Sequence, residues 1–186
     1  REEFSSAIMR LSGKMIEAIK SQRDLADAEE SDLAVTLGRI HSGDFLAEMI
    51  RTYKNADVAT GRYLQTARGA AICTLTSDRM LLSRVVGNMI HNALEASTAG
   101  QMVTLGCQHD TEAGSVTFFV HNPAHMPEAV QQQVFNRSFS TRGKGRGLGT
   151  YSMKLIGERY LQGKVSFRTD PETGTTFRIE LPQNFV

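Results

Sequence analysis

Two pairs of alternating apolar segments constrain the fold of this chain most strongly. Apolar residues occupy every second position of 103–107 and 116–120, and the turn DTEAG separates the two runs. The same pattern recurs over 165–167 and 177–181, around the turn DPETG. Successive side chains of a strand point to opposite faces, so each pair predicts a hairpin with one apolar face.

Helical patterns are interleaved with these hairpins. We predict short strands at 33–40 and 70–76, and helices at 42–56, at 150–161 and from about Asp78 to Leu94. The last of these has a broad apolar face. The sequence therefore predicts an α+β fold, a two-layer α/β sandwich in which a mixed sheet carries its helices on one face.

Residues 1–31 form a separate N-terminal segment. Apolar residues recur there in steps of four and three from Phe4 to Leu25, which is a heptad pattern. It predicts a coiled-coil-type helix with a partner helix, although three heptads equally fit a single amphipathic helix lying on its own domain. Because Arg1 already lies inside this pattern, we expect the chain to be part of a longer protein, with a domain boundary between residues 31 and 32.

Composition narrows the classes of function. The 186 residues suit one compact domain with a modest addition, and a formal net charge of +1 gives no reason to expect nucleic acid or an anionic membrane as a partner. Cys73 and Cys107 have no metal-type spacing and fit small buried side chains in a reducing compartment. No apolar run reaches membrane-spanning length and no signal peptide is present, so we expect a cytoplasmic location.

The long helix carries two asparagines four residues apart. Asn88 and Asn92 share one helix face, with Glu95 one turn further on. Asparagine is a mediocre helix former, and its carboxamide oxygen is a hard ligand that suits Mg²⁺. On spacing alone, the simpler interpretation is that both amides face solvent.

A basic, glycine-rich segment leads into the helix at 150–161. Glycines at 143, 145, 147 and 149 alternate with Lys144, Arg146 and Leu148. Glycines let backbone N–H groups approach an anion, and a helix N-terminus adds partial positive charge, so the pattern indicates a polyphosphate cradle. Taken alone, its simpler interpretation is a mobile surface loop with solvated charges. Two familiar phosphate loops are excluded, because there is no Gly-Lys-Ser or Gly-Lys-Thr ending and no strand directly before the glycines.

Taken in order, these motifs resemble the ATP-binding domain of sensor histidine kinases, which belongs to one superfamily with gyrase-type, mismatch-repair and heat-shock-chaperone ATPases. The motifs are NMIHNALEA, VHNPAHMP, VFNRSFSTR, GRGLGTYSMKLI and GTTF. The similarity covers about Leu33 to Val186. It implies an ATP-binding catalytic domain over 32–186 with ATP and Mg²⁺ as its cofactors.

The resemblance also implies roles for the matched residues. Asn92 would coordinate Mg²⁺, and Asn88 would orient phosphate or a metal-bound water, since an amide cannot act as a general base. The basic, glycine-rich segment would be a lid over the bound nucleotide. It would contact the phosphates through the residues Arg142, Lys144, Gly145, Arg146, Gly147, Leu148, Gly149 and Thr150. Phe135 and Phe139 would anchor the lid in the core. Glu95 stands where many kinases have a cation, and we assign it no ligand role.

The adenine site departs from the family pattern. The segment 121–127 contains neither the expected aspartate nor a glycine. Asn122 is the best substitute, because its oxygen can accept a hydrogen bond from the adenine amine, and His121 is the alternative. Thr176 would support this contact or serve as an ordinary strand threonine. A neutral amide binds less strongly than a carboxylate, so we expect weaker nucleotide binding than in aspartate-bearing relatives.

The function implied is that of the catalytic part of a sensor histidine kinase, which transfers the γ-phosphate of ATP to a histidine. None of the five histidines stands in the acceptor context, so the acceptor would lie outside this chain. Residues 1–31 would be the second helix of a dimerisation and phosphotransfer hairpin. The implied partners are that hairpin, a second copy of the chain and a response regulator, with no nucleic acid and no membrane contact by this chain; membrane anchoring of the parent protein stays open.

Two alternatives come from other classes of protein. One is a nucleotide-binding regulatory module that has lost turnover, which the departures at Asn122, Ala124 and Glu95 favour. The other is a serine kinase of the anti-sigma-factor type. The heptad helix argues against the second, because such kinases lack a phosphotransfer hairpin.

Overall fold

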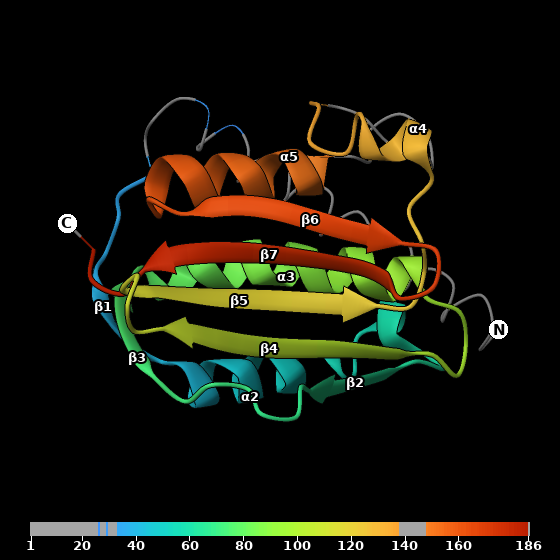
Figure 1. Cartoon of the computed structure of the whole chain (residues 1–186), viewed down its shortest axis with the longest axis horizontal. Coiled ribbons are helices and arrows are strands. Elements are labelled where there is room, and N and C mark those ends of the chain that lie inside the picture. The colour runs from blue at the N-terminus through green and yellow to red at the C-terminus, as the bar shows by residue number, and fades with distance from the viewer. Residues whose placement is uncertain (1–25, 27–28, 30–32, 138–147, 186) are drawn as a thin grey trace, which may run out of the picture.

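The computed structural model describes residues 26, 29, 33–137 and 148–185, and these form an α+β two-layer sandwich (Figure 1). Its mixed sheet has the order β2-β4-β5-β7-β6. The strands are β2 (Tyr63–Thr66), β4 (Met102–Asp110), β5 (Ser115–Asn122), β7 (Gly174–Pro182) and β6 (Lys164–Asp170). β2 runs parallel to β4 and the other pairs are antiparallel. Both predicted hairpins are present, so the predicted fold class is confirmed.

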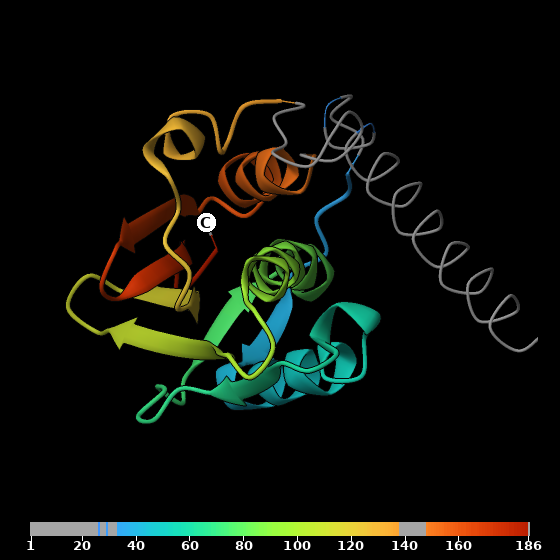
Figure 2. The ribbon, with the colours of Figure 1, turned by 90° about the vertical axis from the view of Figure 1, so that its right-hand side faces the viewer.

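Three helices cover one face of this sheet, as Figure 2 shows. They are α2 (Ser42–Tyr53), α3 (Arg79–Ala96) and α5 (Leu148–Leu155), which continues as a π-helical turn over Ile156–Tyr160. The other helices in the described part of the chain are shorter: a 3₁₀ turn at Asp57–Ala59 and α4 (Glu128–Gln131). The apolar face of α3 is buried against the sheet, and Phe45 of α2 meets Phe118 of β5 edge-on at 5.2 Å between ring centroids.

The strands predicted at 33–40 and 70–76 are shorter than expected. β1 (Gly38–His41) and β3 (Thr74–Ser77) pair with each other in a separate antiparallel sheet. Residues 33–37 are extended but unpaired, and residues 67–71 attach to the edge of β4 by isolated bonds, such as the one from the Ala71 N–H to the Cys107 carbonyl (2.7 Å). β2 was not predicted, because its four residues are mostly exposed and have no clear alternation.

The N-terminal helix predicted within residues 1–31 lies almost wholly outside the described residues. Ala26 and Glu29 are helical, and the Glu29 carboxylate lies 2.9 Å from the Arg137 guanidinium. The coiled-coil-type helix and the boundary at residue 31 stay predictions. No helix in the described ranges is long and apolar enough to cross a membrane.

The turns of the two main hairpins have the same hydrogen-bonding pattern. In each turn an aspartate, Asp110 or Asp170, accepts hydrogen bonds from the backbone N–H groups two and three residues later. The bonds from Glu172 and Thr173 lower the pKa of Asp170, because they favour its charged form. Each turn then ends on a glycine in the left-handed region, Gly114 (φ 62°) or Gly174 (φ 89°). The sequences DTEAG and DPETG therefore specify equivalent turns.

The buried thiol of Cys107 is expected to make the free energy of unfolding depend on pH in alkaline solution. Its thiol is 1% exposed, and burial and then the neighbouring Cys73 thiol, 4.0 Å away, raise its pKa from 9.0 to about 12. The unfolded chain therefore loses this proton first as the pH rises. The free energy of unfolding should be unaffected below about pH 9 and should fall above it, by at most about 1.4 kcal/mol per pH unit.

Urea unfolding of the parent chain and of Cys107→Ala, from about pH 8 to about pH 11, measures this contribution. The variant should be less stable at neutral pH but should show a shallower alkaline decline. Parallel pH profiles for the two proteins would contradict the assignment.

Candidate functional site

The central helix α3 presents the two asparagines. Asp78 caps its N-terminus, since its Oδ1 accepts a hydrogen bond from the Leu81 N–H at 2.9 Å. Burial of one face of α3 against the sheet leaves Asn88 and Asn92 half-buried at the margin of that face. A Cβ placed on Gly149 would lie 3.5 Å from the Asn88 Oδ1. The structure thus brings the asparagine helix and the end of the glycine-rich segment together.

Asn92 has an unpartnered buried atom. Its Nδ2 is buried and has no hydrogen-bond partner among the residues that the structure describes. A buried amide group without a partner is costly, by about 1–3 kcal/mol, so it indicates a position that a ligand would satisfy. A rotation of the Asn92 side-chain amide by 180° exchanges its NH₂ group and its oxygen. The buried position therefore suits either a phosphate oxygen, which would accept a hydrogen bond from the NH₂ group, or a cation, which the oxygen would bind.

The end of β5 brings a second polar group to the same side of the sheet. Asn122 is 2% exposed and continues the buried alternation of Phe118 and Val120, so it faces the helices. Its Nδ2 lies 3.5 Å from the Ala124 carbonyl, which also accepts a hydrogen bond from the Thr175 hydroxyl at 2.7 Å. Asn122, Ala124 and Thr175 therefore form one polar cluster at the edge of the core.

The structure places Thr176 away from this cluster. Thr176 pairs with His121 across the two strands, and its hydroxyl lies 3.0 Å from the His121 ring on the face of the sheet opposite the helices. Thr175, which pairs with Asn122 and is 3% exposed, occupies the position expected for Thr176. Thr175 was not among the predicted residues, although Phe177 and Ile179 set the alternation that turns it inward. The same alternation separates His121 from Asn122.

Aromatic residues fix the segment that precedes the lid. The Phe135 ring lies 5.8 Å from that of Phe167 and 6.2 Å from that of Phe177, between centroids. The Lys154 ammonium of α5 lies over the outer face of Phe135, 5.1 Å from its centroid. Phe135 is therefore an anchor, as predicted, whereas Phe139 lies outside the described residues.

The cationic part of the predicted lid falls within residues 138–147. Arg142, Lys144, Gly145, Arg146 and Gly147 lie outside the described residues. The remaining members, Leu148, Gly149 and Thr150, form the first turn of α5 and are half-buried. In general, the N–H groups of a first helical turn are where anions bind. A shallow cavity between Phe135 and Tyr151 contains none of the predicted site residues.

Residues 77–184, which include α3, Asn122 and α5, match the family described as "Histidine kinase-, DNA gyrase B-, and HSP90-like ATPase". The chain belongs to this family of ATPases. Among its relatives in the family, the sensor histidine kinase YcbM of Bacillus subtilis (strain 168) is 25% identical over 187 residues, 97% of this chain and 60% of YcbM. The chain thus spans less than two thirds of YcbM.

Two solved histidine kinases share the fold of this ATPase domain. Full-length ShkA in complex with AMPPNP has a TM-score of 0.80 at 17% identity, over 98% of this chain and 38% of ShkA. ThkA in complex with the response regulator protein TrrA has a TM-score of 0.71 at 16% identity, over 95% of this chain and 49% of the other.

The family match begins after β1, α2 and β2, but these elements belong to the same packed body. Phe45, Leu46 and Met49 of α2 are buried in the common core. Arg62 donates hydrogen bonds to the Val58 and Thr60 carbonyls beside it and to the carbonyl of Ser97, the C-cap of α3. This ATPase domain therefore has its asparagine helix held at both ends, by Asp78 and by Arg62.

Proposed function

We propose that this chain is the ATP-binding catalytic part of a sensor histidine kinase, with Mg²⁺·ATP bound between α3, the end of β5 and the segment 142–150. The observation that carries this proposal is the unpartnered buried amide of Asn92, on a helix whose Asn88 lies beside Gly149. The likeness of the fold to ShkA, a kinase solved with an ATP analogue, supports it.

The chain's residues would act mainly by positioning and by neutralising charge. Among the described residues no three His, Cys, Asp or Glu side chains converge to hold a metal. By the family resemblance, the Asn92 oxygen would be a protein ligand to Mg²⁺, with phosphate oxygens and water as the other ligands. When bound, the ion would supply neutralisation of the phosphate charge. Asn88 would orient a phosphate oxygen or a water molecule.

The glycine-rich segment would bind the β and γ phosphates. Arg142, Lys144 and Arg146 would supply positive charge, and the backbone of Gly145 and Gly147 could approach the phosphates closely. The first-turn N–H groups of α5, at Leu148, Gly149 and Thr150, would complete the cradle.

Asn122 would accept a hydrogen bond from the adenine amine, with Thr175 beside it. Its Nδ2 lies 3.5 Å from the Ala124 carbonyl, and its oxygen would be the acceptor for the adenine amine. Thr175 replaces the Thr176 of the sequence-based prediction, because only Thr175 shares the face of Asn122.

Beyond this chain, the phosphoryl group would pass to a histidine on an upstream helix and then to a response regulator. Residues 1–31 would belong to the phosphotransfer hairpin and form a homodimer. Relatives named as sensor kinases and the ThkA–TrrA complex support these partners. We also propose a cytoplasmic location for this domain, as expected from the sequence.

Labelled ATP tests the proposed function. A longer protein that includes the upstream helix should acquire phosphate that is labile in acid and stable in base, as phosphohistidine is. Nucleotide binding without transferred phosphate would indicate a regulatory module, which the neutral Asn122 alone would favour. An acid-stable phosphate on serine would indicate the serine-kinase alternative.

Asn122→Asp should tighten the binding of Mg²⁺·AMPPNP by about 3- to 10-fold, since a charge-assisted hydrogen bond is roughly twice as strong as a neutral one. Isothermal titration calorimetry measures the Kd, with urea unfolding as a check on stability. Thr175→Ala should weaken binding, whereas its neighbour Thr176→Ala serves as the matched control and should leave Kd unchanged. Equal or weaker binding by folded Asn122→Asp would refute this assignment of the adenine site.

A further inference from the structure

One buried carboxylate contacts both α3 and residues 33–37, the linker that precedes β1. Asp78 is 3% exposed. Its Oδ2 accepts a hydrogen bond from the Thr36 N–H at 2.6 Å, across 42 residues of sequence. Its Oδ1 accepts the capping hydrogen bond from the Leu81 N–H at 2.9 Å. Both oxygens are thus occupied, one by the linker and one by α3.

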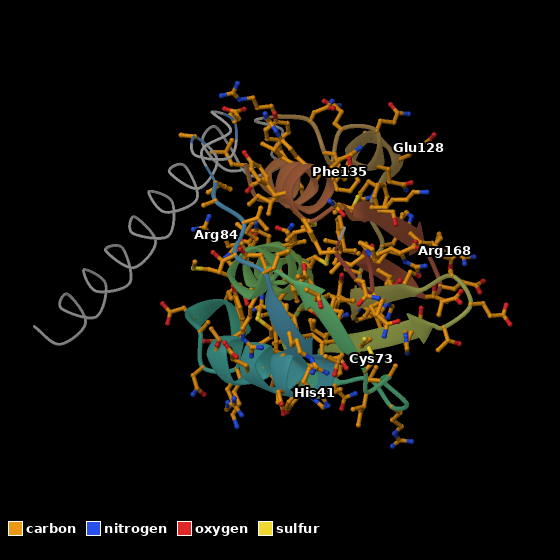
Figure 3. The ribbon with its side chains drawn as sticks, turned by 90° about the vertical axis from the view of Figure 1, so that its left-hand side faces the viewer. His41, Cys73, Arg84, Glu128, Phe135 and Arg168 are labelled. Carbon is orange, nitrogen blue, oxygen red and sulfur yellow. The ribbon has the colours of Figure 1, made fainter. Side chains whose placement is uncertain are left out.

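The surrounding contacts hold the linker, residues 33–37, against the domain. Leu33 and Val35 pack on the core, and the ladder of β1 with β3 begins directly after the linker, with Gly38 opposite Ser77. Figure 3 shows the linker descending beside the helix that carries Arg84 and continuing into β1. The linker is therefore fixed at the N-terminal end of α3, next to Asp78.

We propose that Asp78 is a positioning residue that couples the linker to the nucleotide site through α3. Displacing the linker from Asp78 breaks the hydrogen bond from the Thr36 N–H to a carboxylate, which costs free energy, so the linker and the first turn of α3 are held together. α3 extends without interruption from Arg79 to Ala96 and carries Asn88 and Asn92. A displacement of its N-terminus is thus transmitted to both asparagines.

This coupling is reciprocal and rests on the proposed function. If the linker position affects the asparagines, nucleotide bound at the asparagines must affect the linker by the same free energy. Linker movement imposed from the N-terminal side would then change nucleotide binding, and bound nucleotide would make the linker more rigid.

Hydrogen–deuterium exchange on the whole chain, with and without saturating Mg²⁺·AMPPNP, measures this coupling. In the parent chain the nucleotide should slow exchange of the amides in 33–37 by several-fold. Asp78→Asn keeps one acceptor oxygen for one of the two donors but replaces the other oxygen with an NH₂ group. Thr36→Pro removes the linker N–H donor, and it also fixes φ at residue 36 and restricts Val35. Both variants should lose the nucleotide response of the linker, while the amides around Asn92 still respond.

The control variant is Asp110→Asn, which makes the same chemical change in the remote hairpin turn and should leave the linker response intact. Calorimetry on the same samples measures nucleotide binding, and so separates a failure of the coupling from a failure of the proposed function. A parent chain that binds nucleotide without any change in linker exchange overturns the coupling, as does an unchanged response in both linker variants. A parent chain that binds no nucleotide overturns the proposed function, and the coupling with it.

Discussion

Asn92→Ala is expected to reduce the affinity of the chain for Mg²⁺·AMPPNP by about 10- to 100-fold, because one hydrogen-bonding or ligand contact to a charged group contributes about 1.5–3 kcal/mol. Asn92 is half-buried on α3, and its Nδ2 has no partner in the described part of the chain. Truncation therefore removes the ligand contact without breaking a known internal bond. Stability should stay the same or rise slightly. Calorimetric titration gives the Kd, and urea unfolding gives the stability.

Asn55→Ala is the matched control, since Asn55 is an exposed residue just after α2. It should bind nucleotide like the parent chain. Asn92→Asp keeps an oxygen ligand for the metal and should retain more affinity than the alanine variant. A Kd for Asn92→Ala within about twofold of the parent value would contradict the role of Asn92.

Gly174→Ala is expected to destabilise the folded chain by about 2–5 kcal/mol. This is the sum of the cost of a left-handed backbone conformation for alanine and the cost of a steric overlap of its Cβ. Gly174 has φ of 89°, and a Cβ there would lie 2.2 Å from the Asn122 carbonyl oxygen and 2.6 Å from the Pro123 backbone. The backbone cannot move away without displacing Asn122. The variant should therefore lose nucleotide affinity as well as stability.

Gly114→Ala separates the two causes. Gly114 closes the equivalent turn of the other hairpin with φ of 62°, but nothing lies within 4 Å of its Cβ position. It should lose only about 1–2 kcal/mol, from the backbone conformation, and bind nucleotide normally. Equal losses of stability in the two variants would show that the contact with Asn122 and Pro123 does not matter.

The sequence predicted those parts of the fold in which local pattern and burial agree. The two hairpins follow from strict alternation around DTEAG and DPETG, and α3 follows from its broad apolar face. β2 could not be predicted, because an exposed four-residue edge strand has no alternation of its own and is defined by its pairing with β4. The π-helical end of α5 depends on packing, since a Cβ on Gly157 would lie 2.5 Å from the Val165 side chain.

The candidate site was predictable to the extent that its residues lie close in sequence. Asn88 and Asn92 are one helical turn apart, so spacing placed them on one face. The choice between Thr175 and Thr176 needed the alternation of the whole strand β7, counted inward from Ile179 and Phe177. The contact of Thr36 with Asp78 has no local signal, because it joins residues 42 positions apart through a backbone N–H.

The most direct test of the central claim is an NMR titration of the chain with Mg²⁺·AMPPNP that follows the side-chain amides of Asn92 and Asn122 and the backbone amide of Gly149. We predict saturable shifts at all three with a single Kd, while the remote turn at Gly114 stays unchanged. A nucleotide that binds without shifting Asn92 and Gly149 would contradict the claim that α3 and the glycine-rich segment form one nucleotide site.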